Sequence, residues 1–203
     1  MKQFTIPAGM KDQILGECEI KKQLQLKIEA CLDKWGYKEV ITPTIEYYKT
    51  YEEGFMDICE QDSYKFFDTQ GRILMLRADM TIPIARVVAT KFKDSSLPLR
   101  FRYCANVFKV HEQLSGKRNE TSECGVELIG VEETCGDLEI IATALEALKV
   151  IDKSNWILEI GNINFFNKAC EIVGISGKKQ EKLAHLINNK SMKALKDMFL
   201  LMQ

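Results

Sequence analysis

Apolar residues recur at helical and strand spacings along most of the chain. Between Gly16 and Trp35 they fall on one stripe of a helix, with lysines on the opposite side. Gly36 stands where a helix usually ends, and Tyr37–Thr42 then alternates as a strand that Pro43 closes. This order predicts a helix, a tight turn and a strand, and the apolar stripe of the helix consists of Ile20, Leu24, Ile28, Cys31, Leu32 and Trp35.

Further strand and helix patterns follow before residue 99. Asp62–Asp68 and Ile73–Leu76 have the pattern of two strands joined by a short turn, which predicts a hairpin. A helix is predicted from Thr81, which we expect to cap it, to about Lys91. The segment Glu46–Gly54 is compatible with a short helix.

Two β-rich runs, Leu99–Val110 and Thr121–Ile129, flank a polar segment. This pattern predicts a strand–loop–strand hairpin with a long, charged tip. Such a loop can grip a small polar ligand, or it can simply be a solvated tip, and the pattern leaves both interpretations open. The polar segment holds Ser115, Gly116, Lys117, Arg118 and Asn119.

Helices dominate the remainder of the chain. Asp137 has the position of a cap for one helix, Trp156–Ile160 has the pattern of a strand, and Asn164–Val173 is helical. The tail, Gly177–Gln203, predicts one or two more helices. Hairpins and helices in mixed order, without a regular strand–helix–strand alternation, predict an α+β fold with an antiparallel sheet flanked by helices.

Composition narrows the function classes. The chain has 203 residues, 46% of them hydrophobic, so it can bury a core of one domain, or of one domain with a small appendage. A net charge of −1 argues against a dedicated nucleic-acid binder. Neither a signal peptide in Met1–Met10 nor an apolar run of about 20 residues is present. We therefore expect a cytoplasmic protein without membrane or nucleic-acid partners.

Metal and cofactor motifs are also lacking. The seven cysteines are scattered without a C-x-x-C pair, which indicates reduced thiols. Neither His111 nor His185 has cysteines at ligand spacing, and His185 fits a helix better than a metal site. Glycine-rich dinucleotide and phosphate loops are absent from the sequence, and no nucleophile elbow occurs. We expect neither a metal nor a cofactor.

Four segments, in the correct order, resemble aminoacyl-tRNA synthetases of class II. Gly36–Pro43 resembles their motif 1, and Arg100–Gly130 is similar to motif 2, the strand–loop–strand that holds ATP and the amino acid. Pro7–Asp12 and Leu76–Thr81 are similar to segments of histidyl-tRNA synthetases in particular. The resemblance implies a fold like the catalytic domain of class II synthetases.

Departures from the synthetase pattern point to a paralogous family, the regulatory subunits of ATP phosphoribosyltransferase, which belong to the first step of histidine biosynthesis. The variant Leu-Arg-Ala-Asp-Met-Thr, followed by Ile82–Arg86, is more similar to that family. Lys109 stands where the synthetases have an arginine, and lysine lacks the planar fork that clamps a phosphate. His111 replaces an expected acid, and Lys117 and Asn119 replace loop arginines.

The resemblance therefore implies that amino-acid activation is lost and that the chain has no catalytic residues. The third class II motif and an anticodon-binding domain are not in this sequence. The implied function is to activate the catalytic phosphoribosyltransferase subunit and to contribute to feedback by histidine. Two alternatives stay open: a catalytic fragment of a histidyl-tRNA synthetase, and a synthetase-like module with another partner.

The resemblance also implies part of an amino-acid pocket. Asp79 and Thr81 would face the α-amino group of a ligand, Glu127 its imidazole, and Lys109 its carboxylate. Glu123 stands where the synthetases have a glutamine, and it fits beside the amino group or as a protonated acid. Two structural explanations compete with this pocket: Asp79 caps the helix after it, and Glu127 pairs with Arg102.

Domain organisation and assembly are further expectations from the resemblance. Residues 1–175 are expected to form the synthetase-like core domain, and 176–203 a helical segment that starts an insertion or a truncated remainder. The apolar residues in Lys196–Gln203 suggest a shortened chain, or a natural short form whose tail docks on a partner. We expect a homodimer through Gly36–Pro43 and a hetero-oligomer with the catalytic phosphoribosyltransferase subunit.

Overall fold

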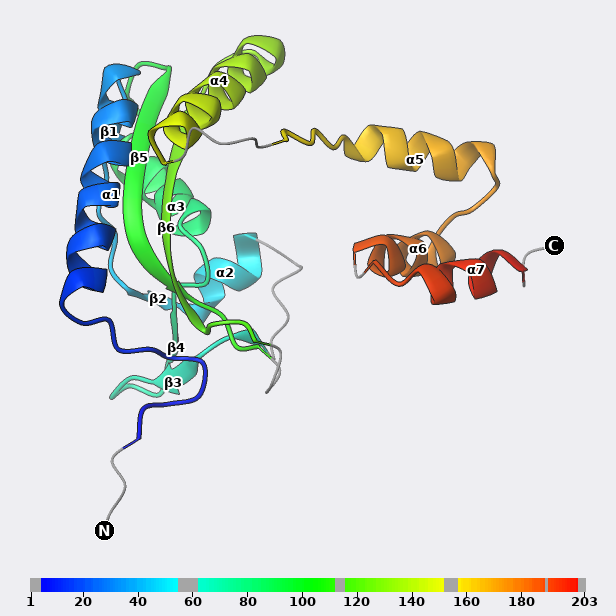
Figure 1. Ribbon diagram of the computed structural model, residues 1–203, viewed down its shortest axis with the longest axis horizontal. Coiled ribbons are helices and arrows are strands. Elements are labelled where there is room, and N and C mark those ends of the chain that lie inside the picture. Colours follow the sequence, from blue (N-terminus) through cyan, green and yellow to red (C-terminus); the bar gives the residue numbers. More distant parts are fainter. Residues whose placement is uncertain (1–4, 55–61, 112–115, 152–156, 189, 201–203) are drawn as a thin grey trace. The chain divides into compact units, whose positions relative to one another are not determined.

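The computed structural model describes residues 5–54, 62–111, 116–151, 157–188 and 190–200 (Figure 1). The chain divides into two compact units, Met1–Ser154 and Asn155–Gln203. The larger unit holds the strands and helices α1 to α4, and the smaller unit holds α5 to α7. The predicted α+β class is confirmed, while the division of the chain at residue 175 remains a prediction.

Helix α1 (Gly16–Lys34) ends as the sequence predicts. Gly36 adopts a positive φ of 84°, and its N–H donates to the carbonyl of Asp33 at 3.0 Å. The N–H of Tyr37 donates to the carbonyl of Leu32 at 3.3 Å, which completes a Schellman motif. The turn sends the chain into strand β1 (Lys38–Glu39) and buries Tyr37 completely.

The predicted long hairpin forms the main sheet. Strands β5 (Leu99–Phe108) and β6 (Glu120–Ile129) pair antiparallel over their whole length, from Leu99 opposite Ile129 to Phe108 opposite Glu120. Strand β1 adds to the other edge of β5 in parallel, giving the order β1-β5-β6. The sheet is therefore mixed rather than purely antiparallel.

The two faces of this hairpin serve different purposes, because side chains alternate along a strand. Even-numbered residues of β5 face helix α1 and helix α4 (Glu133–Ile151), which flank the hairpin in Figure 1. Arg100 binds Glu139 of α4 through two nitrogens, at 2.7 and 2.8 Å. Odd-numbered Phe101 and Val107 are buried against Met80 and Ile84. The second face is the one that carries the predicted site residues of β6.

A second, antiparallel sheet has the order β2-β4-β3 (Ile45–Tyr47, Ile73–Leu76 and Lys65–Phe67). Helix α2 (Tyr48–Gly54) and helix α3 (Thr81–Lys91) share a buried core with this sheet. In it, Tyr51 of α2 and Ile82 of α3 pack with Met75 of β4 and with Ala78. The predicted bounds of β4 and α3 are confirmed.

Arg77, which is buried, connects the two sheets of the larger unit. Its Nε donates to the carbonyl of Asn106 in β5 at 2.8 Å, and its Nη1 donates to the carbonyl of Thr42 at 2.9 Å. The N–H of Phe108 donates to the Arg77 carbonyl at 2.9 Å. These bonds hold the chain just after β4 against the hairpin.

The smaller unit consists of α5 (Ile163–Ile172), α6 (Lys178–Asn188) and α7 (Met192–Leu200) around Cys170, Ile175, Leu183 and Met198. The prediction of helices in this tail is confirmed, and His185 is a helix residue. The prediction of a strand at Trp156–Ile160 is wrong for residues 157–160, and Trp156 lies outside the described residues. Ile157 and Ile160 are 88% and 71% exposed, so no strand among the described residues covers them.

The cysteines differ from the prediction at one pair. Cys104 and Cys124 lie directly opposite each other in the hairpin, with their Cα atoms 4.1 Å apart, and the structure joins them as a disulfide. The expectation that all cysteines are reduced is therefore wrong for these two, because sequence spacing does not reveal cross-strand register. Cys18, Cys31, Cys135 and Cys170 are free, and Cys59 lies outside the described residues.

Candidate functional site

Three of the five predicted site residues, Asp79, Thr81 and Glu127, lie where the start of α3 meets the odd-numbered face of the hairpin, and Glu123 lies further along the same face of β6. Glu123 and Glu127 project from β6, opposite Ala105 and Phe101 in register. The hydroxyl of Thr81, the first residue of α3, donates to Oε1 of Glu127 at 2.8 Å. Helix and hairpin are thus joined through a side chain that sequence reasoning assigned to the pocket.

Asp79 caps helix α3. Its Oδ1 accepts the N–H of Ile82 at 3.0 Å, and its backbone carbonyl accepts the hydroxyl of Tyr51 at 3.1 Å. The structural explanation of Asp79 is therefore confirmed, and the prediction that Thr81 caps the helix is wrong. The hydroxyl of Thr81 binds Glu127 instead, and the carboxylate of Asp79 occupies the capping position.

The site is acidic, and its groups influence one another. Burial raises the pKa of the Glu127 carboxyl; the hydrogen bond from Thr81 opposes this shift, and the charge of Asp79 adds to it. Burial, followed by the charges of Glu127, Glu123 and Asp79, raises the pKa of Tyr103 to about 12. A cation placed among these carboxylates would relieve their mutual repulsion.

Arg102 does not pair with Glu127, so that structural alternative is wrong. Arg102 lies on the opposite face of the hairpin, where its Nε binds Asp33 of α1 at 2.8 Å. Glu39 and Glu29 lie 3.6 and 4.0 Å from its Nη1. Adjacent even and odd positions of a strand point to opposite sides, which separates Arg102 from the site.

Lys109 stands apart from the acids. It follows the last residue of β5, its side chain is exposed, and its backbone N–H donates to the carbonyl of Asn119 at 2.8 Å. Within the described ranges, no hydrogen bond or ion pair links its amine to Asp79, Glu123 or Glu127. Its predicted contact with a ligand carboxylate stays a prediction.

Asn119 has a structural role that sequence reasoning missed. It is 8% exposed, and its amide nitrogen donates to the Tyr64 hydroxyl at 2.7 Å and to the Ala8 carbonyl at 3.3 Å. Its Oδ1 accepts the N–H of His111 at 3.1 Å, and its own N–H donates to the Gly9 carbonyl at 2.8 Å. Asn119, which stands where the synthetases have a loop arginine, thus connects the N-terminal segment to the hairpin.

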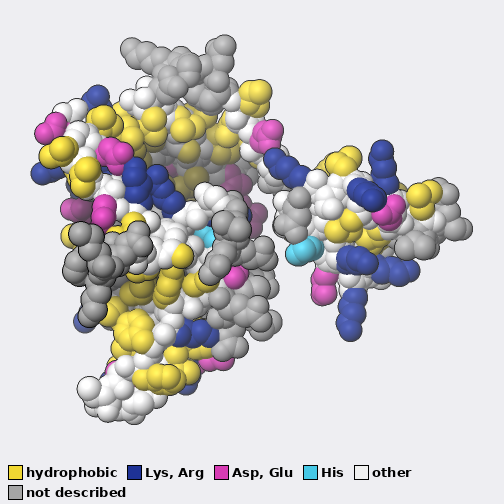
Figure 2. Space-filling model, turned by 60° about the horizontal axis from the view of Figure 1, so that its bottom comes forward, with side chains coloured by type: hydrophobic (Ala, Val, Ile, Leu, Met, Phe, Trp, Pro, Cys, Tyr) yellow, Lys and Arg dark blue, Asp and Glu magenta, His cyan; other side chains and the backbone are white. Residues whose placement is uncertain are grey.

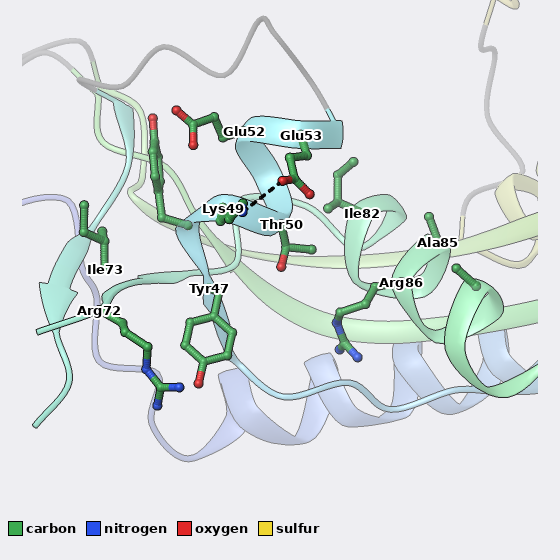
Figure 3. A pocket seen from close by; sticks show the side chains of 12 residues that line it. Tyr47, Lys49, Thr50, Glu52, Glu53, Arg72, Ile73, Ile82, Ala85 and Arg86 are labelled. Carbon is green, nitrogen blue, oxygen red and sulfur yellow. Dashed lines mark ion pairs between the residues drawn. The ribbon is translucent and has the colours of Figure 1, made fainter. Parts of the chain in front are cut away.

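A hollow of about 900 Å³ lies between β2, α2, α3 and the start of β4 (Figure 3). The cations at its wall already have partners: Arg86 binds Glu46 at 2.6 and 2.9 Å, Arg72 binds Asp68 at 2.6 Å, and Lys49 pairs with Glu53 at 3.4 Å. Its remaining walls are largely apolar, as Ile73, Ile82, Ala85 and Ala89 illustrate. None of the five predicted site residues lines it, so this hollow is not the pocket that the sequence predicts.

Comparison with known proteins identifies the fold first. Histidyl-tRNA synthetase from Nostoc sp. PCC 7120 superimposes with a TM-score of 0.76 over 97% of the chain at 18% identity, which shows a shared fold. A protein from Bacillus halodurans, described as an ATP phosphoribosyltransferase regulatory subunit/histidyl-tRNA synthetase, gives a TM-score of 0.86 at 33% identity. That match covers 97% of this chain and 51% of the other. The fold is that of class II aminoacyl-tRNA synthetase catalytic domains.

The family follows from the sequence comparisons. A family model described as histidyl-tRNA synthetase matches residues 9–202, so the chain belongs to the histidyl-tRNA synthetase family. A protein from Acetivibrio thermocellus is 42% identical over 95% of this chain, and one from Clostridium novyi is 38% identical over 97%. Both are named ATP phosphoribosyltransferase regulatory subunit. This chain spans 46% and 47% of their lengths.

Proposed function

We propose that this chain is part of a non-catalytic regulatory subunit of ATP phosphoribosyltransferase, in the first step of histidine biosynthesis. It would act in the cytoplasm, bind the catalytic subunit, raise its activity and contribute to feedback by histidine. The observation that carries the proposal is the shared name of relatives 38% and 42% identical over almost the whole chain. No described helix is long and apolar enough to cross a membrane.

The site supports a regulatory function over the alternative, a catalytic synthetase fragment. Activation of an amino acid requires the α-phosphate of ATP to be clamped, for which the arginine fork is suited. Lys109 keeps a charge without the fork, and Asn119 has its amide engaged with Ala8 and Tyr64. Each lost charge-assisted contact removes about 1.5–3 kcal/mol, so the loss of several lowers a rate by orders of magnitude.

Histidine is the small-molecule ligand that we propose for the acidic site. Asp79, Thr81 and Glu123 would receive its ammonium group, Glu127 its imidazole, and Lys109 its carboxylate. The clustering of carboxylates around Glu127, whose pKa is raised by burial and by Asp79, favours a cationic ligand. Histidine bound there would shift the equilibrium between two quaternary arrangements of the complex.

A homodimer through Gly36–Pro43 is the proposed assembly. Figure 2 shows hydrophobic side chains on the surface of the larger unit. Ile41, within this segment, is 84% exposed, and Ile20 and Leu26 of α1 are 69% and 56% exposed. An isologous contact would cover these residues, because a two-fold axis brings the same patch of both subunits together.

The test uses the full-length chain and its catalytic subunit. Tagged regulatory chain should recover the phosphoribosyltransferase subunit in a pull-down, and it should show only background ATP–pyrophosphate exchange with histidine. Robust histidine-dependent exchange would instead establish the synthetase alternative. Background exchange without recovery of the catalytic subunit would favour a synthetase-like module with another partner.

A further inference from the structure

Cys104 and Cys124 lie directly opposite each other near the middle of the long hairpin. Their Cα atoms are 4.1 Å apart, close enough for a bridge without the backbone movement that a separation above about 7 Å would require. Cys124 is exposed and Cys104 is half-buried, so solvent reaches the pair from the side of β6. The pair is therefore open to small thiols and disulfides, unlike a disulfide enclosed in a core.

A hollow of about 490 Å³ begins one step along the ladder from this pair. Asn106 and Ser122 line it, and the Ser122 hydroxyl donates to Oδ1 of Asn106 at 2.6 Å. Each of them is two residues from one of the cysteines, and they are register partners. Side chains at this spacing share a face of a strand, so the hollow and the cysteine pair lie on the same face of the hairpin. A small molecule seated in the hollow is therefore beside the exposed Cys124.

The hollow offers cations to an anionic ligand. Lys21 of α1 and Arg118 of the hairpin tip line it, and neither makes an ion pair within the described ranges of the chain. The amine of Lys21 donates to the neutral side-chain oxygen of Gln13 at 3.1 Å. Lys11, by contrast, is ion-paired with Glu17 at 2.8 Å. Carboxylates of a peptide-like ligand can therefore bind Lys21 and Arg118, and the acids of the wall suit its ammonium group. The charged lining residues are Lys11, Lys21, Arg118, Asp12 and Glu120.

We propose that Cys104 and Cys124 are a reversible thiol–disulfide exchange site for an anionic low-molecular-weight disulfide of the glutathione class, seated in this hollow. The thiolate of Cys124 attacks one sulfur of the small disulfide, whose S–S bond breaks and releases one thiol. Cys104 then attacks the Cys124 sulfur of the mixed disulfide and releases the second thiol. Two electrons and two protons thus pass from the pair to the small disulfide, and an excess of the small thiol reverses both steps.

Closing the bridge constrains the hairpin whose other face carries the acidic site. It makes a covalent ring of the chain between positions 104 and 124, which contains Lys109 and Asn119 at the tip and Glu123 beside Cys124. In a reducing compartment the pair is a dithiol, and a rise in oxidised small thiols closes the ring. A ring of this size removes conformational freedom from the opened states of the hairpin, so amide exchange in β5 and β6 should be about tenfold or more slower in the oxidised chain. Equal exchange rates in the two forms would contradict this constraint.

Peptide mapping by mass spectrometry tests the exchange on the full-length chain, first reduced and then incubated with glutathione disulfide. In wild type, Cys104 and Cys124 should be bridged without an adduct, and excess glutathione should restore both thiols. Cys104→Ser should instead retain one glutathione on Cys124, because the second attack is missing. Cys18 and Cys135, which are exposed and free, are controls within the same chain and should keep a glutathione adduct. A wild-type pair that stays reduced, or an adduct that persists on Cys124 of wild type, would overturn the proposal.

Charge reversal tests whether the hollow receives the small disulfide. Lys21→Glu should slow bridge formation by glutathione disulfide about threefold or more, and should accelerate it with cystamine, a small disulfide that carries positive charges. Lys93→Glu is the matched control, because Lys93 is exposed just before β5, at the other end of the hairpin from the tip, and should change neither rate. Equal rates in wild type and Lys21→Glu with both reagents would overturn the hollow as the binding site.

Discussion

Replacing Glu127 with glutamine separates a ligand-binding role from a structural one. The change keeps the shape of the side chain and an oxygen that can accept the Thr81 hydroxyl, now 2.8 Å away. It removes the negative charge of the Glu127 carboxylate, which we propose to bind the imidazole of histidine. Loss of one charge-assisted hydrogen bond, about 1.5–3 kcal/mol, corresponds to roughly 10- to 150-fold weaker binding of histidine.

Stability should respond differently from binding. Burial and the charge of Asp79 raise the pKa of Glu127, so the folded state disfavours its ionised form. This carboxyl therefore stabilises the fold below its unfolded pKa, and that contribution is lost as the pH rises through the higher folded pKa. At neutral pH, Glu127→Gln should be as stable as wild type or slightly more so, and this difference should vanish in acid.

Calorimetric titration with histidine and thermal melts at neutral and acidic pH measure both effects on the full-length chain. Glu120→Gln is the matched control, because Glu120 lies on the same strand and accepts the amide of Asn106 at 2.7 Å, away from the acidic site. Unchanged histidine affinity in Glu127→Gln would refute the binding role. A loss of several kcal/mol in stability at neutral pH would refute the electrostatic reasoning.

Four further substitutions test other contacts of the protein. Arg102→Met leaves the acids of α1 and β1 without their cation, and it should lower the free energy of unfolding by about 1–3 kcal/mol in urea titrations. Lys168→Met breaks an exposed ion pair and should lower the free energy of unfolding by less than about 1 kcal/mol. Asn119→Ala should free the N-terminal segment, seen as faster exchange of the backbone N–H of residue 119, which donates to the Gly9 carbonyl, and an unchanged rate would contradict the tethering role. Ile41→Asp should convert the proposed homodimer to monomer in sedimentation, and a dimer that persists would exclude this segment as the contact.

Local patterns predicted local structure well. The alternation of Ile73–Leu76, the helical spacing after Thr81 and the glycine at position 36 each reflect forces within a few residues of sequence, and the structure confirms all three. Helix α4 begins at Glu133, so the prediction that Asp137 caps it is wrong, and Asp137 lies inside the helix.

Features that depend on contacts across the sheet were not predictable from local patterns. The pairing of Cys104 with Cys124 and the alignment of Tyr103 with Gly125 follow from the hairpin register, which the loop length leaves open. The separation of Arg102 from Glu127 follows from strand alternation within that register. The resemblance to the synthetase motifs predicted which acidic residues belong to the site. The roles of Asp79 and Asn119 in the fold were visible only in the structure.

The proposed regulatory function is tested most directly by titrating the full-length chain into a fixed amount of catalytic ATP phosphoribosyltransferase subunit and measuring the transferase rate. The account predicts a rate that rises until the two chains reach a fixed stoichiometry, and that falls when histidine is added. A rate that stays constant throughout the titration would contradict it.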